Sequence, residues 1–232
     1  MEHPAATPSV ANLIGRSIRE AVGLLLPVAC VGCGEPDAAL CDSCLASVPG
    51  PPAVRTLAGD LPVWAGTDYD GVVRRAILAL KNDQRTDVAR GLGVILRRAF
   101  DQALAELPAR VGTVTDLRLA TIPSSRSAYR RRGYRPVDRV LAKAGLKAEH
   151  PLALTRQPGD QIGLGIVGRQ RNLAGSMRAV RRVDGATFLL IDDVVTTGAT
   201  VIEARRALEE GGASVIGAAV LAATPRRIRP TV

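Results

Sequence analysis

The chain has 232 residues, 47% of them hydrophobic and 3% aromatic, and a formal net charge of +9 at neutral pH. This length suits one α/β domain with a small accessory module. No apolar run reaches the roughly 18 residues that cross a bilayer, and no signal-peptide pattern is present, so we expect a cytoplasmic protein. The scarcity of aromatic residues argues against base-stacking surfaces, whereas the charge suits a polyanionic partner, either a diphosphorylated sugar or nucleic acid.

Composition divides the sequence into four segments and a linker. Residues 1–24 form an N-terminal arm whose apolar residues recur at helical spacing, which predicts an amphipathic helix. Residues 25–48 hold all the cysteines, and the proline- and glycine-rich residues 48–60 are typical of a linker. Residues 61–225 alternate between strand-like and helical patterns, and residues 226–232 form a basic tail.

The four cysteines form two Cys-x-x-Cys pairs, Cys30 with Cys33 and Cys41 with Cys44. Four thiolates in this arrangement suit a tetrahedral Zn²⁺ ion, and an intracellular setting disfavours structural disulfides. An iron–sulfur or rubredoxin-type iron site is the chemical alternative. Because four protein ligands leave no open position for catalysis, the sequence predicts a structural metal site.

The first elements of the larger segment are a strand over 63–69 and a helix that Asp70 caps and that runs to Leu80. Lys81 follows at the C-terminal end of this helix, where the helix dipole favours a cation. A ligand-facing role for Lys81 is the alternative, and the pattern does not choose between them. A second helix is predicted over 87–107, ending before a proline.

A second apolar strand is predicted over 117–122, and Pro123 and Ser124 begin the turn that follows it. A turn at this position can present backbone amides to a diphosphate. The arginine-rich run Arg126–Arg135 comes next, and such runs are either solvated faces or contacts for nucleic acid or polyphosphate. Gly133 followed by an aromatic residue indicates a shaped loop.

The rest of the second half alternates in the same way. The pattern predicts a helix over 137–146 and a strand over 150–154. The polar residues 156–165, which include proline and glycine, are a candidate mobile loop, and residues 169–172 lie on a short helix. A last buried strand is predicted over 215–222.

The stretch 188–200 combines features that suit a phosphorylated sugar. The apolar residues 188–191 predict a strand buried on both faces, and Asp192 and Asp193 follow it directly. A turn of hydroxyls and glycine comes next, before a helix predicted over 201–210. Free N–H groups at a helix start bind phosphate, and carboxylates after a strand hold sugar hydroxyls or hydrated Mg²⁺.

This stretch resembles the phosphoribosyl-diphosphate (PRPP) binding motif of type I phosphoribosyltransferases at each of its positions. Over about residues 25–223 the chain resembles the ComF (ComFC, GntX) family of phosphoribosyltransferase-like proteins. The blocks that carry this second resemblance are Leu25-Leu26-Pro27 before the cysteine pairs, Lys81, Arg132-Gly133-Tyr134, Gln161, and Arg169-Gln170-Arg171-Asn172-Leu173.

The resemblance implies an α/β fold of the type I phosphoribosyltransferase kind, a parallel sheet flanked by helices, with a small N-terminal zinc ribbon held by four cysteines. It implies that Asp192 and Asp193 contact the ribose hydroxyls or Mg²⁺. The residues implied for the 5′-phosphate are Thr196, Thr197, Gly198, Ala199 and Thr200.

Other residues are implied for the diphosphate and for a flexible hood over the site. The diphosphate loop contains Pro123 and Ser124, and Arg132 and Lys81 stabilise the leaving diphosphate. The hood residues are Gly133, Tyr134, Gln161, Arg169 and Asn172. The chain departs from the family at Arg135-Pro136, where Asn-Gln is usual, which leaves the acceptor contacts of this loop open.

Two classes of function follow from these expectations. As an enzyme, the chain transfers phosphoribose from PRPP, bound with Mg²⁺, to a nitrogen acceptor that the sequence does not name. As a non-enzymatic module, it senses PRPP or a related nucleotide-like ligand, or handles single-stranded DNA through its arginines. The family's association with DNA uptake and competence points to single-stranded DNA and to DNA-uptake or recombination proteins as partners.

Overall fold

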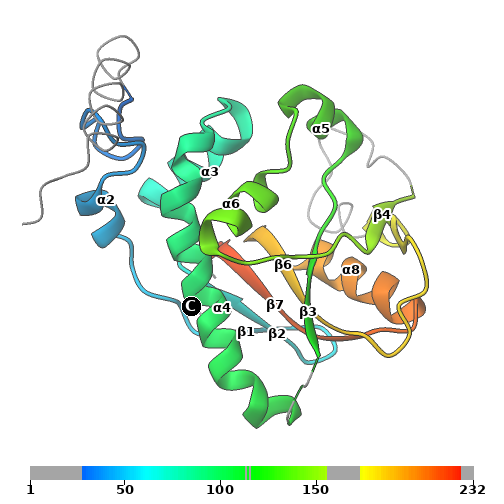
Figure 1. Ribbon diagram of the computed structural model, residues 1–232. Helices are drawn as coiled ribbons and strands as arrows, with labels where there is room; N and C mark the ends of the chain where they lie inside the picture. The colour runs from blue at the N-terminus through cyan, green and yellow to red at the C-terminus, as the bar shows by residue number, and fades with distance from the viewer. Residues whose placement is uncertain (1–27, 113, 115, 156–172, 226–232) are drawn as a thin grey trace, which may run out of the picture.

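The computed structural model describes residues 28–112, 114, 116–155 and 173–225. Its centre is a five-stranded sheet in the order β1-β2-β7-β6-β3 (Figure 1). All neighbouring strands pair in parallel except β1 and β2, which are antiparallel. The strands of this sheet are β1 Arg55–Leu57, β2 Leu61–Ala65, β3 Leu117–Thr121, β6 Thr187–Val195 and β7 Ser214–Ala223.

Helices cover both faces of the sheet. One face packs against helices α3, α4 and α6 around the buried Trp64, and the other packs against α8 around Phe188. A two-stranded antiparallel sheet of β4 and β5 lies beside α8. The remaining elements are α2 Asp42–Ala46, α3 Gly71–Asn82, the 3₁₀ turn η1 Thr86–Val88, α4 Ala89–Val111, α5 Arg126–Arg132, α6 Pro136–Ala144, β4 Leu152–Leu154, β5 Met177–Ala179 and α8 Ala199–Glu210.

This arrangement confirms the predicted α/β fold with a mostly parallel sheet between helices. Central strands of such a sheet are buried on both faces, which is why β6 and β7 read as continuous apolar runs. The predicted cap of α3 is also present, because the Asp70 side chain accepts a hydrogen bond from the Gly71 N–H.

The sequence predicted a linker over residues 48–60, but this segment contains strand β1. Gly59 and Asp60 have φ angles of 72° and 55°, and this left-handed backbone turns the chain into a hairpin with β2. The pairing aligns Leu57 with Leu61. The prolines that precede β1 concealed this hairpin at the sequence level.

Four other element predictions were wrong in extent or type. The strand predicted over 63–69 is β2, which ends at Ala65. Helix α4 continues through Pro108 to Val111. Pro108 lies in the last turn, where its missing N–H leaves only one carbonyl, in the preceding turn, without its helical hydrogen bond. The arginine run is helical as α5, capped by the Ser125 side chain, rather than a loop. Strand β6 continues past Asp192 and Asp193, because the sheet partner β7 extends equally far.

The described part of the chain has no helix long and apolar enough to cross a membrane. The predicted N-terminal helix and the basic tail lie outside the described residues. The same holds for the loop 156–165 and the short helix 169–172, which include Gln161, Arg169 and Asn172.

Candidate functional site

The parallel strands place the sequence-predicted residues along one edge of the sheet. Strands β2, β3, β6 and β7 run in the same direction, so their carboxyl ends meet at this edge, where open α/β sheets bind ligands. Thr121 pairs with Ile191, and the Ile122 N–H bonds to the Ile191 carbonyl. Pro123 therefore leaves β3 beside Asp192 on β6.

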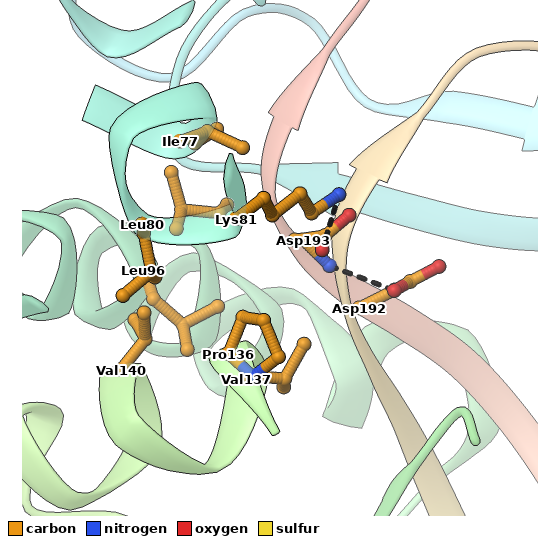
Figure 2. Close-up of a pocket in the computed structure, with 10 residues that line it drawn as sticks. Ile77, Leu80, Lys81, Leu96, Pro136, Val137, Val140, Asp192 and Asp193 are labelled. Atoms are coloured by element: carbon orange, nitrogen blue, oxygen red, sulfur yellow. Dashed lines mark hydrogen bonds and ion pairs between the residues drawn. The ribbon is translucent and has the colours of Figure 1, made fainter. Parts of the chain in front are cut away.

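Lys81 reaches this edge from helix α3. Its Nζ lies 2.6 Å from Oδ2 of Asp193, and the two side chains are 27% and 20% exposed (Figure 2). The backbone N–H of Asp193 donates to Oδ1 of Asp192 at 2.8 Å, which holds the Asp192 carboxylate against the backbone of β6. Of the two interpretations of Lys81, the structure favours a side chain that faces the carboxylates over one that only complements the helix dipole.

The first of these carboxylates, Asp192, has a raised pKa. Burial and the adjacent Asp193 carboxylate raise the pKa of Asp192 from 3.8 to about 7, although a backbone hydrogen bond and Lys81 oppose the shift. At neutral pH Asp192 therefore lies near its titration midpoint. A ligand that brings hydroxyl donors or a cation would stabilise the ionised form of this carboxylate.

An apolar wall lies below the carboxylates, between α3, α4, α6 and the sheet. Its pocket is lined by Asp192, Asp193 and Lys81 at one end and by apolar side chains elsewhere (Figure 2). The apolar members are Ile77, Leu80, Leu96, Pro136, Val137, Val140 and Leu221. This wall keeps water away from one side of the carboxylates and accounts for much of the burial of Asp192.

The hydroxyl-rich turn begins helix α8 at the same edge. Thr196 and Thr197 are exposed, and Thr197 Oγ1 accepts a hydrogen bond from the Ala199 N–H. Gly198 has a φ of 83°, and a Cβ there would lie 2.5 Å from Leu57 Cδ1. Both the left-handed backbone and the contact with Leu57 require glycine here. Because Gly198 has no side chain to cap α8, the N–H groups that follow Ala199 in the first turn can bind an anion.

The residues of the Arg132-Gly133-Tyr134 block dock onto the end of α3. Arg132 Nε donates to the Lys81 carbonyl at 2.6 Å, and the Tyr134 hydroxyl donates to the Leu80 carbonyl. Gly133 ends α5 with a left-handed φ of 75°, which turns the chain so that Tyr134 can reach α3. The block is thus connected through α3 to the Lys81–Asp193 ion pair.

A second pocket, lined by polar and apolar side chains, adjoins Pro123 and Ser124, and the sequence analysis did not identify Asp138 or His150 as part of it. His150 Nδ1 lies 2.7 Å from Thr121 Oγ1, and His150 Nε2 lies 3.6 Å from Asp138 Oδ2. In the sequence, His150 stands outside any metal-ligand spacing. Its proximity to the turn follows from tertiary structure, and no local motif marks it.

Arg135 and Pro136, where the chain departs from the family pattern, have local structural roles. Pro136 is the first residue of α6, a position that tolerates its missing N–H. Arg135 lies over the Tyr129 ring and 4.0 Å from Asp138.

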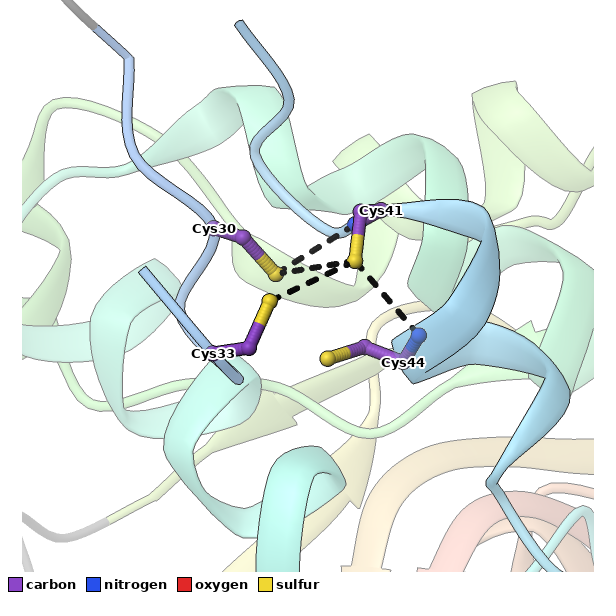
Figure 3. A group of neighbouring side chains, drawn as sticks. All are labelled: Cys30, Cys33, Cys41 and Cys44. Atoms are coloured by element: carbon purple, nitrogen blue, oxygen red, sulfur yellow. Dashed lines mark hydrogen bonds between the residues drawn. The ribbon is translucent and has the colours of Figure 1, made fainter. Parts of the chain in front are cut away.

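The four cysteines form a compact cluster beside α3 (Figure 3). Their Sγ atoms all lie within 4.8 Å of one another, and Cys41 Sγ is 3.6 Å from the Sγ atoms of both Cys30 and Cys33. Four thiolates at about 2.3 Å from a tetrahedral zinc ion are about 3.8 Å apart. The cluster therefore fits a metal ion of this size.

The thiol acidities agree with a cation site. Burial raises the pKa of Cys30, but backbone N–H groups of Cys41, Cys33 and Gly32 outweigh it and lower that pKa to about 6. Contact with Cys33, burial and the other thiols raise the pKa of Cys44 to about 12. All four sulfurs can be thiolates at neutral pH only when a cation offsets their charge.

Comparison with known proteins gives a family match and several relatives. Residues 130–231 match the model of the phosphoribosyl transferase domain. The chain is 26% identical over 214 residues to the DNA utilization protein YhgH of Salmonella typhimurium, covering 89% of this chain and 87% of that protein. It is 30% identical over 157 residues to the protein of the same name from Escherichia coli K12, covering 64% and 66%.

Two solved structures are also similar. An allosteric regulatory enzyme of purine biosynthesis aligns with 18% identity and a TM-score of 0.34, over 58% of this chain and 26% of that one. The glutamine PRPP amidotransferase of B. subtilis, complexed with ADP and GMP, aligns with 20% identity and a TM-score of 0.31, over 59% and 27%. The chain spans about a quarter of the length of these enzymes.

Proposed function

We propose that this chain binds PRPP with Mg²⁺ at the carboxyl edge of its sheet and transfers the phosphoribosyl group to a nitrogen acceptor. The match to the phosphoribosyl transferase domain, the similarity to YhgH and the four-cysteine cluster fit a ComF-like protein and support the proposal. One observation carries the proposal. The anion-accepting turn that begins α8 and the paired carboxylates Asp192 and Asp193 lie on the same strand–turn–helix unit.

Each group at this edge has a role in the proposal. The turn from Thr196 to Thr200 holds the 5′-phosphate with its N–H groups and hydroxyls. Asp192 and Asp193 accept the ribose hydroxyls or hold Mg²⁺, whose oxygen-ligand preference they fit. Magnesium, when bound, neutralises the diphosphate. Lys81 shares its charge between Asp193 and the incoming diphosphate.

The transfer step requires the site to stabilise charge that develops on the ribose and on the departing diphosphate. A C–N bond forms at the ribose anomeric carbon as the C–O bond to diphosphate breaks, and positive charge develops on the ribose. Asp192 and Asp193 stabilise that charge, while Arg132, Lys81 and the turn at Ser124 stabilise the departing diphosphate. Positioning and fixed charges supply the rate, without a protein nucleophile.

Calorimetry with PRPP, Mg²⁺ and zinc-loaded protein tests the proposal. We expect saturable binding that Asp192→Asn or Asp193→Asn weakens at least about tenfold, a loss of about 1.4 kcal/mol. Asp184→Asn is the matched control, because Asp184 precedes the amino end of the same strand and pairs with Arg182. Wild-type protein that does not bind PRPP refutes the proposal.

Turnover separates an enzyme from a sensor that uses the same site. An enzyme releases diphosphate from PRPP only when an acceptor base is present, and this release requires Mg²⁺. A sensor binds PRPP with the same dependence on Asp192 and Asp193 and releases none with any of the nucleobases. A screen of nucleobases with a coupled diphosphate assay decides between them.

A DNA-handling function is the second candidate, favoured by the exposed arginines of α5 and by the similarity to proteins named for DNA utilization. Arg126, Arg130 and Arg131 are exposed, whereas Arg132 is engaged with the Lys81 carbonyl. Exposed arginines on one short helix suit a phosphate backbone, with an affinity that falls steeply with salt. The scarcity of aromatic residues limits any stacking contribution.

Fluorescence anisotropy with a labelled single-stranded oligonucleotide tests this candidate. We expect Arg130→Ala with Arg131→Ala to weaken binding and to make the slope of log affinity against log salt shallower by about 1.4, since each phosphate contact contributes about 0.7. Arg97→Ala, on the exposed surface of α4, is the control. Titrations that stay flat at low salt eliminate the DNA candidate.

A further inference from the structure

Helix α3 and the loop after it hold the first cysteine pair by its backbone. Arg75 Nε donates to the Val31 carbonyl at 3.0 Å, and Arg75 Nη2 donates to the Gly32 carbonyl at 3.2 Å. Arg85 Nη2 donates to the Ala29 carbonyl at 3.0 Å. Three carbonyls around Cys30 are therefore fixed by two guanidinium groups.

Arg85 is itself held in place. Its Nε and Nη2 donate to the Asp87 carboxylate at 2.9 and 2.8 Å, a two-point contact that fixes the guanidinium plane. Asp87 belongs to the turn η1 that begins α4. The first cysteine pair is thus connected to the end of α3 and to the start of α4.

The cysteine module also packs closely against both helices. A Cβ on Gly32 would lie 2.5 Å from Cys44 Sγ and 3.3 Å from Val72 Cγ1 of α3. A Cβ on Gly91 of α4 would lie 2.5 Å from Leu40 Cδ2 of the module. Contacts this close leave little room for the module to shift without moving the helices.

The two arginines bracket Lys81 along the chain. Arg75 lies on α3 before Lys81, and Arg85 lies directly after the helix. Lys81 Nζ pairs with Asp193, and the Lys81 carbonyl accepts from Arg132. A single short segment therefore contacts the cysteine module on one side and the carboxylate edge on the other.

We propose that Arg75 and Arg85 are positioning residues through which the metal-holding cysteine module sets the position of Lys81 against Asp193. This inference rests on the proposed function, because Lys81 and Asp193 lie in the proposed PRPP site. When the cysteine pairs close around a metal ion, the carbonyls they carry become a rigid template for both arginines. Metal loss then loosens the end of α3 and weakens PRPP binding, and by linkage PRPP raises the affinity for the metal ion by the same factor.

Hydrogen exchange on wild-type protein tests the connection without any ligand. We expect peptides that cover residues 75–85 to exchange at least about threefold faster after zinc is removed by a chelator, with β6 and β7 unchanged. In Arg75→Ala with Arg85→Ala, exchange at the end of α3 is already fast and does not respond to zinc. Unchanged exchange over 75–85, or a uniform rise across the sheet, overturns the inference.

A double-mutant cycle separates positioning from a general structural effect. Arg75→Ala is expected to weaken PRPP affinity about fivefold in the wild-type background and to have no further effect in Lys81→Met, because it acts through Lys81. Arg74→Ala, an exposed neighbour on α3, is the control. An equal loss in both backgrounds shows a structural role only and overturns the proposal.

Zinc affinity, measured by equilibrium competition with a colorimetric chelator, gives the reciprocal measurement. PRPP with Mg²⁺ is expected to raise zinc affinity about fivefold in the wild type and to leave it unchanged in Arg75→Ala. If PRPP does not bind the wild type, the proposed function fails, and hydrogen exchange alone decides whether the module positions Lys81. If PRPP binds but neither zinc affinity nor exchange at α3 responds, this inference fails while the proposed function stands.

Discussion

Asp192→Asn is expected to stabilise the fold at neutral and alkaline pH while weakening PRPP binding. The folded protein raises the pKa of Asp192 from 3.8 to about 7, so between these values the folded state binds a proton that the unfolded state does not. Stability therefore falls as pH rises through this window. Asparagine has nearly the shape of the protonated side chain and cannot ionise, so the stability of the variant does not fall with pH in this way.

The size of the effect follows from the shift. Each pKa unit corresponds to about 1.4 kcal/mol, so a shift of roughly three units sets an upper limit of about 4 kcal/mol above pH 7. Asp192 is only half-buried, and solvent reduces the penalty. We expect Asp192→Asn to exceed the wild type by about 2 kcal/mol at pH 8 and to match it near pH 4.

Urea unfolding of both proteins at several pH values, without Mg²⁺ or PRPP, measures this difference. The two free energies of unfolding should coincide near pH 4 and diverge toward pH 8, with the variant above the wild type. A difference that is constant with pH shows that Asp192 does not titrate in this window. A variant less stable than the wild type at pH 8 refutes the assignment of Asp192 as a strained carboxylate.

Lys81→Met leaves two adjacent carboxylates without a cation, so we expect a loss of about 1 kcal/mol at pH 8 and a higher pKa for Asp192, both measured by urea unfolding. Gly198→Ala meets Leu57 and strains a left-handed backbone, so we expect a cost of about 3 kcal/mol in the same assay. Gly133→Ala has strain but no close neighbour and should cost about 1 kcal/mol. Cys41→Ser is expected to lower zinc from about one ion per chain to well below one, by elemental analysis.

Specific outcomes contradict these expectations. Equal losses of unfolding free energy for Gly198→Ala and Gly133→Ala would show that the Leu57 side chain moves aside at no energetic cost. Full stability of Lys81→Met at pH 8 would show that the ion pair is offset by desolvation. Iron in place of zinc in the purified protein would select the alternative metal for the cysteine cluster.

Several features could be predicted from local sequence because their causes are local. The helix that Asp70 begins depends on one side chain and its neighbouring N–H groups, and the prediction was confirmed. The proximity of Cys30, Cys33, Cys41 and Cys44 follows from spacing, since each pair closes over two residues.

Other features escaped prediction because a distant segment decides them. Residues 55–57 form a strand only because β2 offers its edge, and the arginine run is helical although Gly133 followed by an aromatic residue indicated a loop. His150 reaches Thr121 because the preceding residue, Glu149, forms a parallel bridge with Ala120 of β3.

The stretch 188–200 shows both cases in one motif. Its apolar run, carboxylates and hydroxyl–glycine turn were identifiable from sequence, because strand, turn and helix start each have their own local pattern. Tertiary structure alone placed Lys81 at 2.6 Å from Asp193 and buried Asp192 enough to raise its pKa to about 7. Ion pairing and desolvation depend on which segments pack together, so the sequence determined the chemical groups, and the packing around β6 decided the pKa of Asp192.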